Sequence, residues 1–442
     1  MRTLRLGLVA ALALPAAAPA QPPSLSAAEQ AVVRAVDARN AEALALLERT
    51  VNINSGTHNF AGVRQVGDVL RAELDALGFR TRWVDGAPFK RAGHLVAEHA
   101  GPGPKLLLIG HLDTVFEPSS PFQRWERLTD TTARGPGVTD MKGGNVILVH
   151  ALKALRDARL LDRMNVTVVL NGDEEDAGAP TELARKALTE AARGAAAAIG
   201  FEDGPGDPTL AVVSRRGAGG WTLKVMGVPA HSSQIFKPEI GAGAIYEGSR
   251  ILTAFYERLS KEPYLTFNPG VALGGTAVTV DSTGTVGSAS GKSNVVAEHM
   301  TITGDLRTLS PEQLARAKAT MREIVGQSLP RTAATIEFDD GYPPMAPTDG
   351  NRRLLATYDR ISRDLGLWPV EATDPSRAGA ADVSFVAHLV PMLIDGIGLS
   401  GRAGHTVNET ADLRMLPVQT KRAALLLHRL TAGAGAPPRV TK

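Results

Sequence analysis

The stretch KLLLIGHLDT, residues 105–114, decides the fold class, because an apolar run gives way at once to a glycine and then to polar side chains. The stretch NVTVVLNGDEE, residues 165–175, repeats this pattern. Short apolar runs bounded by turn residues are typical of strands buried in a parallel sheet. Residues 141–160, between the two stretches, carry apolar side chains at helical spacing. The order strand, helix, strand therefore predicts a βαβ unit of an α/β domain.

Composition bounds the size of the protein and the kind of partner it takes. A chain of 442 residues with 43% hydrophobic and 21% charged side chains is typical of a globular protein with two domains, or with one domain that carries an insertion. A formal net charge of +2 gives no basic footprint for nucleic acid or for an anionic membrane. We therefore expect a small-molecule partner, no nucleic acid and no membrane. The chain has no cysteine, so any metal must be held by nitrogen and oxygen atoms.

The two ends of the chain differ in composition from its body. Residues 1–20 contain two arginines, a short apolar run and the small-x-small motif Ala18-Pro19-Ala20, which predicts a secretory signal peptide. The mature protein is then expected to begin near Gln21 and to be exported, to the periplasm or to the medium. Residues 432–442 are rich in alanine, glycine and proline, which predicts a flexible tail.

From about residue 213 the pattern changes to short strands and two helices. Strands are indicated near residues 221–225, 277–280, 300–306 and 334–338, and helices at 245–259 and from Pro311 onward. Ser310 as N-cap, with Gln313 three residues later, predicts a capping box at the second helix. The order βαββαβ resembles a ferredoxin-like α+β module.

This module interrupts the α/β domain. We predict that residues 213–340 form the inserted domain. The catalytic domain is then built from residues 21–212 and 341–431, one part before the insertion and one after it.

Polar side chains stand at five places where apolar segments end, and together they have the composition of a two-metal centre. In open α/β sheets, sites form where loops leave the carboxyl ends of strands. Two histidines and three carboxylates suit zinc, with one carboxylate free to bridge two ions. The predicted metal ligands are His111, Asp140, Glu175, Glu202 and His405, with Asp140 as the bridge.

Two further carboxylates have predicted roles beside these ligands. Glu174 directly precedes Glu175, so it can act as the general base that takes a proton from metal-bound water and later protonates the leaving amine. Asp113 lies two residues beyond His111, where it can accept the second ring proton of that histidine and fix its tautomer. The sequence therefore predicts a hydrolase that uses metal-activated water at neutral pH.

These stretches resemble those of the M20 family of metallopeptidases, nearest to its glutamate carboxypeptidase branch. The motifs at residues 111–113, 140–144, 173–175 and 404–406 occur in the same order in that family. The resemblance implies a mixed-sheet zinc-peptidase catalytic domain with an inserted dimerisation (lid) domain, and hence a homodimer. It also implies two Zn2+ per subunit, with Co2+ or Mn2+ as substitutes. One ion is held by His111, Asp140 and Glu202, and the other by Asp140, Glu175 and His405.

Two segments of the inserted domain also resemble the family. The segment GVPAHS, residues 227–232, implies that His231 helps to stabilise the tetrahedral oxyanion, in dimers from across the interface. Asn294 and Arg307 resemble family positions that contact the carboxylate or the backbone of the substrate, and arginine suits carboxylate recognition. Glutamate-releasing members have an arginine in the turn that here holds Tyr342, and a lysine where this chain offers Thr209. The identity of the released residue therefore stays open.

The predicted function is a carboxypeptidase of the M20 type, which cleaves a peptide or amide bond next to a free carboxylate in a small peptide or an N-acyl amino acid. Among enzymes of the same fold, the alternatives are an N-acyl-amino-acid amidohydrolase or deacetylase and an aminopeptidase. The alternative outside the enzymes is a binding protein on a retired peptidase fold. The presence of all five ligands together with Glu174 argues against a retired site.

Overall fold

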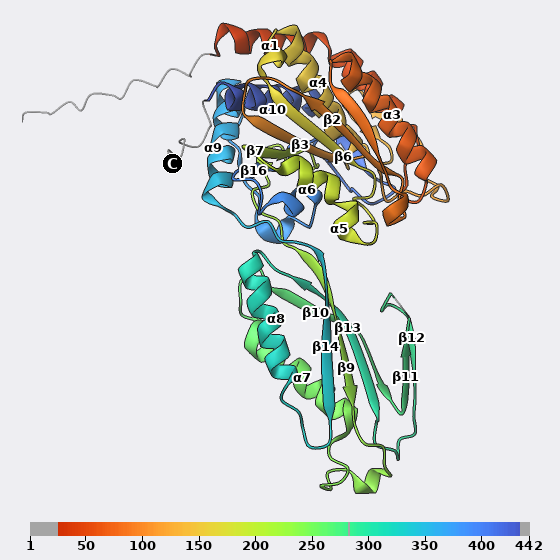
Figure 1. Cartoon of the computed structure of the whole chain (residues 1–442). Helices are drawn as coiled ribbons and strands as arrows, with labels where there is room; N and C mark the ends of the chain where they lie inside the picture. Colours follow the sequence, from red (N-terminus) through yellow and green to blue (C-terminus); the bar gives the residue numbers. More distant parts are fainter. Residues whose placement is uncertain (1–24, 282, 434–442) are drawn as a thin grey trace, which may run out of the picture.

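The computed structural model describes residues 25–281 and 283–433, which form two lobes joined by a narrow neck (Figure 1). The larger lobe takes chain from both sides of the smaller one, which is inserted between them. The predicted signal peptide and most of the predicted tail lie outside the described residues. Within the two described ranges, no helix is long and apolar enough to cross a membrane.

The larger lobe is built on a mixed six-stranded sheet. Its strand order is β1-β2-β6-β3-β7-β16, in which the last four strands are parallel and β1 and β2 are antiparallel to their neighbours. The strands are β1 (Arg80–Asp85), β2 (Gly93–His99), β3 (Lys105–His111), β6 (Asn165–Asn171), β7 (Ala197–Gly200) and β16 (Leu393–Ile394). The two strands predicted from the sequence are β3 and β6, which are neighbours in the centre of the sheet.

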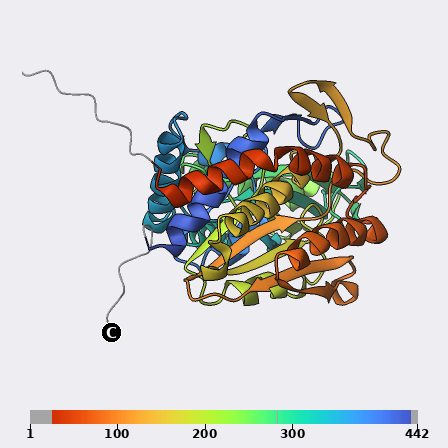
Figure 2. The ribbon, with the colours of Figure 1, turned by 90° about the horizontal axis from the view of Figure 1, so that it is seen from above.

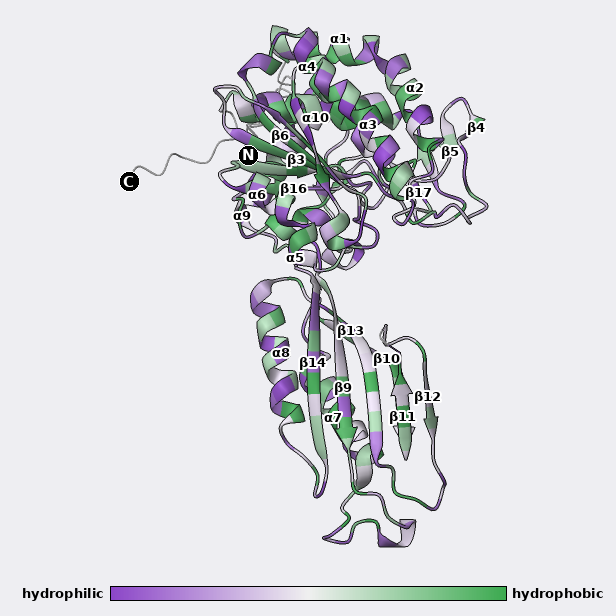
Figure 3. Ribbon diagram, turned by 45° about the vertical axis from the view of Figure 1, so that its right-hand side comes forward, coloured by the Kyte–Doolittle hydropathy of each residue, from purple (hydrophilic) through white to green (hydrophobic). Residues whose placement is uncertain are grey.

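Helices cover both faces of this sheet. The long helices lie on one face (Figure 2) and are α1 (Ala27–Ala38), α2 (Asn40–Val51), α3 (Phe60–Ala76), α4 (Lys142–Asp157), α9 (Asp349–Asp364) and α10 (Met415–Thr431). Shorter elements cover the other face: α5 (Thr181–Ala184), α6 (Lys186–Ala192) and the 3-10 helix η5 (Asp382–Val386). Alternate side chains of β3 face the two layers, with Leu106 and Leu108 under the long helices and Leu107 and Ile109 toward α6 and η5. The sheet is therefore hydrophobic on both faces, and Figure 3 shows its central strands β3 and β6 mainly in the green of hydrophobic residues.

Short elements complete the larger lobe. A four-stranded sheet of order β17-β18-β5-β4 is formed by β4 (Glu126–Thr129), β5 (Thr132–Arg134), β17 (Gly401–Arg402) and β18 (Thr410–Asp412). β8 (Leu210–Ala211) pairs with β15 (Glu371–Ala372). The 3-10 helices of this lobe, besides η5, are η1 (Ala87–Phe89), η2 (Leu161–Arg163) and η4 (Pro375–Arg377).

The smaller lobe is an antiparallel sheet with two helices on one face (Figure 1). The strand order is β10-β13-β9-β14, formed by β9 (Ala218–Met226), β10 (Thr266–Gly275), β13 (His299–Arg307) and β14 (Ala333–Tyr342). The helices are α7 (Gly243–Leu259) and α8 (Pro311–Val325), and a 3-10 turn, η3 (Ser232–Gln234), follows β9. Trp221, Phe255 and Ile302 lie in its own apolar core. The βαββαβ order agrees with a ferredoxin-like module, while the bounds 213–340 stay a prediction.

Two details of the smaller lobe differ from the expectation. The strand predicted at 277–280 is β11 (Ala277–Val280), but it pairs with β12 (Gly287–Ser290) in a hairpin outside the four-stranded sheet. The strand of that sheet that follows β9 along the chain is β10, and no strand is predicted there from the sequence. At the start of α8, Gln313 accepts the backbone N–H of Leu309 at 2.7 Å rather than that of Ser310, so one half of the predicted capping box forms.

Candidate metal centre

The sheet places three of the predicted ligand segments side by side. β3 ends at His111, which lies opposite Asn171, the last residue of β6. β7 runs along the other side of β3 and ends at Gly200, two residues before Glu202. Because these three strands are parallel, the segments that leave their carboxyl ends share one edge of the sheet.

Two further segments bring the remaining predicted ligands to this edge. Asp140 lies in the turn before α4. His405 lies in the loop between β17 and β18, with a left-handed backbone at φ 62°, a conformation that is uncommon for residues other than glycine. Strained backbone of this kind is often found at functional sites.

The five predicted ligands form two groups of three that share Asp140. One group is His111, Asp140 and Glu202, the other is Asp140, Glu175 and His405, and within each group one donor atom per residue lies within 4.8 Å of the others. Oδ1 of Asp140 is 3.0 Å from Nε2 of His111, and its Oδ2 is 2.9 Å from Nε2 of His405. The two oxygens of one carboxylate thus face two different groups, which is the arrangement a bridging ligand needs.

The separations of the donor atoms suit an ion of the size of zinc. Two ligand atoms held about 2.1 Å from a tetrahedral ion are about 3.4 Å apart. Nε2 of His111 lies 3.5 Å from Oε1 of Glu202, and Nε2 of His405 lies 3.2 Å from Oε2 of Glu175. Each group can therefore take one ion with little movement of its side chains.

The carboxylates of this cluster repel one another because they are buried together. Burial raises the pKa of Glu175 to about 7, and the charge of Asp140 adds to the shift. Burial also raises the pKa of Glu202 to about 7, against the opposing charge of His111. The pKa of Glu174 is raised well above its ordinary value by burial and by the charge of Glu202. Positive charge is needed at this site before all of these groups can ionise.

The histidines and one orphaned oxygen show that the cluster fits cations. Hydrogen bonds to Asp140 and Glu175 raise the pKa of His405 to about 11. Burial opposes a charge on His111, but the neighbouring carboxylates, Glu202 foremost, outweigh it and raise its pKa well above the ordinary value. Oε1 of Glu175 is buried without a hydrogen-bond partner among the described residues. A divalent ion in each group would satisfy these nitrogen and oxygen atoms, so the residues present fit a pair of metal ions.

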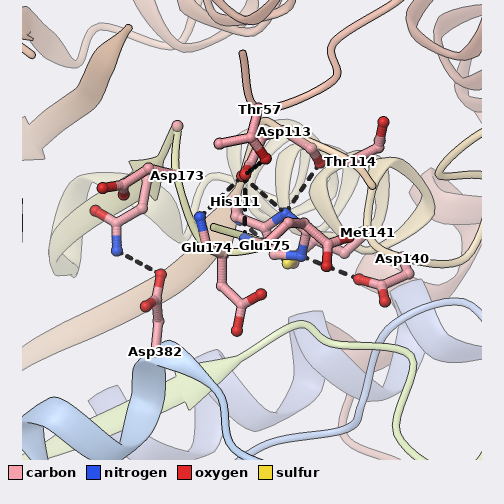
Figure 4. Close-up of polar contacts among 12 residues, drawn as sticks. Thr57, His111, Asp113, Thr114, Asp140, Met141, Asp173, Glu174, Glu175 and Asp382 are labelled. Carbon is pink, nitrogen blue, oxygen red and sulfur yellow. Dashed lines mark hydrogen bonds and ion pairs between the residues drawn. The ribbon is translucent and has the colours of Figure 1, made fainter. Parts of the chain in front are cut away.

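Asp113 ties His111 to the segment that carries the predicted base (Figure 4). Its Oδ1 accepts the N–H of Glu174 at 3.0 Å, and its Oδ2 accepts the N–H of Glu175 at 3.1 Å and the hydroxyl of Thr57 at 2.7 Å. Nδ1 of His111 lies 3.1 Å from the backbone carbonyl oxygen of Asp113 and 3.4 Å from its carboxylate. Beside its predicted contact with the histidine, Asp113 thus holds the turn between Glu174 and Glu175.

Glu409 is a supporting residue for which no role is predicted from the sequence. Its buried carboxylate accepts the N–H of Gly137 at 2.9 Å, of Thr139 at 2.8 Å and of Asp140 at 3.1 Å. These bonds fix the turn that presents the bridging carboxylate. Glu409 lies four residues after His405 in one polar stretch, and that proximity was the signal that could have found it.

Asp395 is a second supporting residue that sequence reasoning missed. Its Oδ1 accepts the N–H of Glu202 at 3.3 Å, and its Oδ2 pairs with Nε of Arg215 at 2.8 Å. The side chains of Asp395 and Arg215 are almost fully buried, whereas that of Glu202 is partly exposed. Asp395 and Glu202 are 193 residues apart in the chain, so no local pattern connects them.

His231 and Asn294 are not brought to the cluster. β9 leaves the neck at Ala218 and, at about 3.3 Å per residue, runs about 26 Å to Met226. His231 follows five residues later, and the backbone N–H of Ser232 donates to the carbonyl of Asn294 at 2.9 Å. Both residues therefore lie at the end of the smaller lobe that is far from the neck.

Arg307 lies at the opposite end of the same lobe. It is the last residue of β13, and the preceding Leu306 pairs with Gly219 at the start of β9. Its guanidinium bonds to Asp305 at 2.9 Å. Arg307 is thus near the neck, on the side of the larger lobe.

A cavity of about 180 Å³ opens onto the cluster. From the cluster it is lined by Asp140, Glu174, Glu202 and His405, and from the neck and nearby loops by residues that include Arg215 and Arg377. A small substrate that enters this cavity meets both predicted ligand groups and the predicted base.

Known proteins share this sequence pattern and this fold. The model of the family described as "Peptidase family M20/M25/M40" matches residues 107–429. Carboxypeptidase G2 of Pseudomonas sp. (strain RS-16) is 28% identical over 395 residues, which cover 88% of this chain and 89% of that protein. Succinyl-diaminopimelate desuccinylase of Xanthomonas oryzae pv. oryzae (strain MAFF 311018) is 26% identical over 362 residues, which cover 79% of this chain and 90% of that protein.

A solved structure agrees in fold. The aminopeptidase PepT of Bacillus cereus matches with a TM-score of 0.69 and 18% identity, covering 88% of this chain and 98% of that one. At that identity the likeness concerns the fold alone.

Proposed function

The chain belongs to peptidase family M20/M25/M40 and is a metallopeptidase of that family, and from this premise we propose that it is a dizinc carboxypeptidase. It cleaves a peptide or amide bond next to a free carboxylate. The observation that carries the proposal is the shared Asp140, whose two oxygens face His111 and His405 in separate ligand groups. The likeness to carboxypeptidase G2 over most of both chains supports the same reaction class.

The proposed ligands divide between the two zinc ions as the groups do. His111, Asp140 and Glu202 hold one ion, and Asp140, Glu175 and His405 hold the other. Zinc is proposed because the donors are nitrogen and oxygen at tetrahedral separations, and Co2+ or Mn2+ are the expected substitutes. Such a pair, when bound, lowers the pKa of water from about 15.7 towards 7 and polarises the carbonyl of the substrate.

Glu174 is the proposed general base. Its carboxylate lines the cavity, and it belongs to neither ligand group. There it takes a proton from the attacking water and delivers it to the leaving nitrogen. Asp113 supports this role, because it accepts the backbone N–H of Glu174 and so holds the base in place.

Arg307 is proposed to bind the free carboxylate of the substrate. It lies at the neck, and a guanidinium binds a carboxylate through two parallel hydrogen bonds. To do so it must exchange its present partner, Asp305, for the substrate. Both side chains of that ion pair are more than a third exposed, so breaking the pair costs little free energy.

His231 and Asn294 support a homodimer. At the far end of the smaller lobe they cannot reach the metal centre of their own subunit, so we propose that they serve the centre of a second one. Phe236 and Tyr246 are 65% and 56% exposed at that end, with ring centroids 5.6 Å apart, and they offer apolar surface for the contact. Light scattering of the purified protein tests this. A monomer that is fully active, and whose activity survives His231→Ala, would contradict it.

Export is the remaining expectation about the whole chain. Residues 1–20 carry the proposed signal, and the mature protein is proposed to act in the periplasm or the medium. Fractionation of cells, with N-terminal sequencing of the recovered protein, checks both the location and the cleavage near Gln21.

An N-acyl-amino-acid amidohydrolase is the second candidate function. The relative that is a succinyl-diaminopimelate desuccinylase covers 79% of this chain, and removing an acyl group from an amine uses the same water, base and metal pair. In both candidates the recognised carboxylate belongs to the amino acid that is released, so they differ in the group on the other side of the scissile bond, which is a peptide in the first and a simple acyl group in the second.

The test is a substrate panel offered to the zinc-loaded protein. Dipeptides, N-acyl amino acids and folyl-glutamates are compared, each with a free and with an amidated carboxyl terminus. The carboxypeptidase reading predicts that amidation abolishes hydrolysis of N-blocked dipeptides. Hydrolysis of no member of the panel would refute the proposed function, and an equal rate on amidated peptides would refute carboxylate recognition.

A further inference from the structure

We propose that Tyr342, held by Arg185, is a positioning residue for the general base: its hydroxyl fixes the peptide group that joins Glu174 to Glu175. Tyr342 stands where glutamate-releasing members of the family have an arginine, a position that bears on the choice of substrate. Its contacts assign it instead to the support of the reaction. The proposal rests on the proposed function, because Glu174 and Glu175 act at that metal centre.

The hydroxyl of Tyr342 donates one hydrogen bond and accepts another, and both partners belong to the larger lobe. It donates to the backbone carbonyl oxygen of Glu174 at 2.7 Å and accepts from Nη2 of Arg185 at 2.7 Å. Tyr342 does not line the cavity at the metal centre. A substrate in that cavity therefore meets the carboxylate of Glu174 and not the phenol.

One planar peptide group is thereby held from both sides. The carbonyl of Glu174 accepts from Tyr342, and the N–H of Glu175, in the same peptide plane, donates to Oδ2 of Asp113 at 3.1 Å. Fixing both polar ends of the peptide fixes its plane, and with it the directions in which the side chains of Glu174 and Glu175 leave the backbone. One of these is the proposed base and the other a proposed ligand.

Arg185 is a rigid anchor for the phenol. Its side chain is 2% exposed and forms ion pairs with Asp173 at 2.6 Å and with Asp382 at 2.7 Å, while Nη2 also donates to the backbone carbonyl of Asp173 at 3.0 Å (Figure 4 shows the two carboxylates). A planar guanidinium bound on several sides has little freedom to move. The hydroxyl that accepts from it is therefore held as firmly.

The ring of Tyr342 is also seated in the larger lobe, although the residue ends a strand of the smaller one. It meets Phe385 edge-on with centroids 4.9 Å apart, and Arg185 lies 5.6 Å and 5.3 Å from the two ring centroids. Tyr342 is the last residue of β14, the strand that returns the chain to the larger lobe. Tyr342 thus links the smaller lobe to the peptide beside the base, where a misplacement of about 1 Å in a catalytic group can cost about 100-fold in rate.

Tyr342→Phe tests the proposal, because it removes the hydroxyl and keeps the ring. With zinc loaded, kcat is expected to fall about 10-fold to 100-fold, while KM stays within about 3-fold, because substrate contacts are untouched. In metal-free protein, hydrogen exchange of the Glu175 amide is expected to be about 10-fold faster, because the peptide group has lost one of its two hydrogen bonds. This second readout needs neither metal nor substrate.

Tyr358→Phe is the matched control. Tyr358 is also buried, and its hydroxyl bonds to Oε1 of Gln419 at 3.0 Å between α9 and α10, within the helical layer. Its loss is expected to leave kcat and the exchange of the Glu175 amide unchanged. If Tyr342→Phe behaves like this control in both readouts, the proposal is overturned.

Two other outcomes are also decisive. If the wild-type protein hydrolyses nothing, the proposed function fails, and the exchange measurement alone then decides whether Tyr342 holds the peptide. If Tyr342→Phe does not fold, Phe385→Leu replaces it. That change removes the aromatic contact that positions the ring of Tyr342 and keeps the hydroxyl. A fall in kcat of about 3-fold to 10-fold at constant KM is then expected, and an unchanged kcat overturns the proposal.

Discussion

The metal centre of the larger lobe and the core of the smaller lobe bury charge in opposite ways. In the larger lobe, Glu175 and Glu202 lie so deep among other carboxylates that the pKa of each is raised to about 7 by burial. In the smaller lobe, the buried Glu247 pairs with Arg250 on the same helix at 2.6 Å and accepts the N–H of Leu329 at 3.0 Å. The smaller lobe balances its own charge, whereas the metal centre leaves its charge for cations to balance. One lobe should therefore be stable by itself, and the other should depend on what it binds.

Removing the bridge should have the largest effect. Asp140→Asn takes away the charge that the two ligand groups share, so we expect both ions to be lost and kcat/KM to fall by at least about 10,000-fold. Metal analysis by mass spectrometry and hydrolysis of the best panel substrate measure the two effects.

The control for this change lies in the smaller lobe. Glu323→Gln removes a carboxylate that pairs with Arg258 at 2.9 Å on the surface, where solvent screens the pair and its contribution to stability is small. Its metal content and activity should equal those of the wild type. If Asp140→Asn keeps two ions, the bridge is assigned to the wrong residue.

A cavity in the core of the smaller lobe should destabilise that lobe alone. Phe255 is fully buried, with its ring centroid 5.9 Å from that of Trp221, and Phe255→Ala is expected to cost about 3 to 5 kcal/mol of unfolding free energy. Denaturant unfolding followed by tryptophan fluorescence measures it. The content of metal per chain should not change, and a fall in metal content would show that the lobes are not independent.

Chelation should have the converse effect. Removing two ions that are each present at about 10 to 30 times their dissociation constants is expected to lower the stability of the larger lobe by about 3 to 4 kcal/mol in total. Hydrogen exchange should show the loss at residues 137–140 and 171–175 and no change in β9 and β13. A uniform loss over both lobes would contradict the comparison.

A smaller effect is expected from His150 on α4, which lies in the larger lobe away from the predicted ligands. Burial lowers the pKa of His150 from 6.5 to about 4, with the charge of Lys153 adding to the shift, and neither ring nitrogen has a hydrogen-bond partner among the described residues. The folded state prefers the neutral ring, so this contribution is present above about pH 6.5 and is lost as the pH falls to about 4, by about 2 to 3 kcal/mol.

His150→Phe isolates that contribution. The unfolding free energies of the wild type and the variant are measured between pH 4 and pH 7. The wild type should lose stability relative to the variant as the pH falls. Parallel curves would show that the burial of His150 carries no such cost.

The sequence predicts those parts of the fold and the site whose signals are local. β3 and β6 are continuous apolar runs that end in polar residues, so the strands and the side chains at their ends could be recognised together. β10 could not, because it is an edge strand in which half of the residues are exposed and which has a bulge beside Pro269. The segment Ala277–Val280 has the better strand pattern, yet it forms the separate hairpin.

The supporting contacts depend on packing between distant segments. Tyr342 meets Glu174 across 168 residues, and Asp395 meets Glu202 across 193. Neither contact has a signature in spacing or periodicity. Apart from Asp113, whose position beside His111 is a local signal, the residues that hold the site in place are therefore visible only in the folded chain.

The central claim is that two ions bridged by Asp140 drive hydrolysis next to a free carboxylate. Zinc titration of metal-free protein, with heat of binding and rate of hydrolysis followed on the same sample, tests it most directly. We predict two zinc ions per chain, with activity that appears only as they bind and that is lost when the peptide is C-amidated. Binding of one ion or none, or equal rates on the free and amidated peptides, would contradict it.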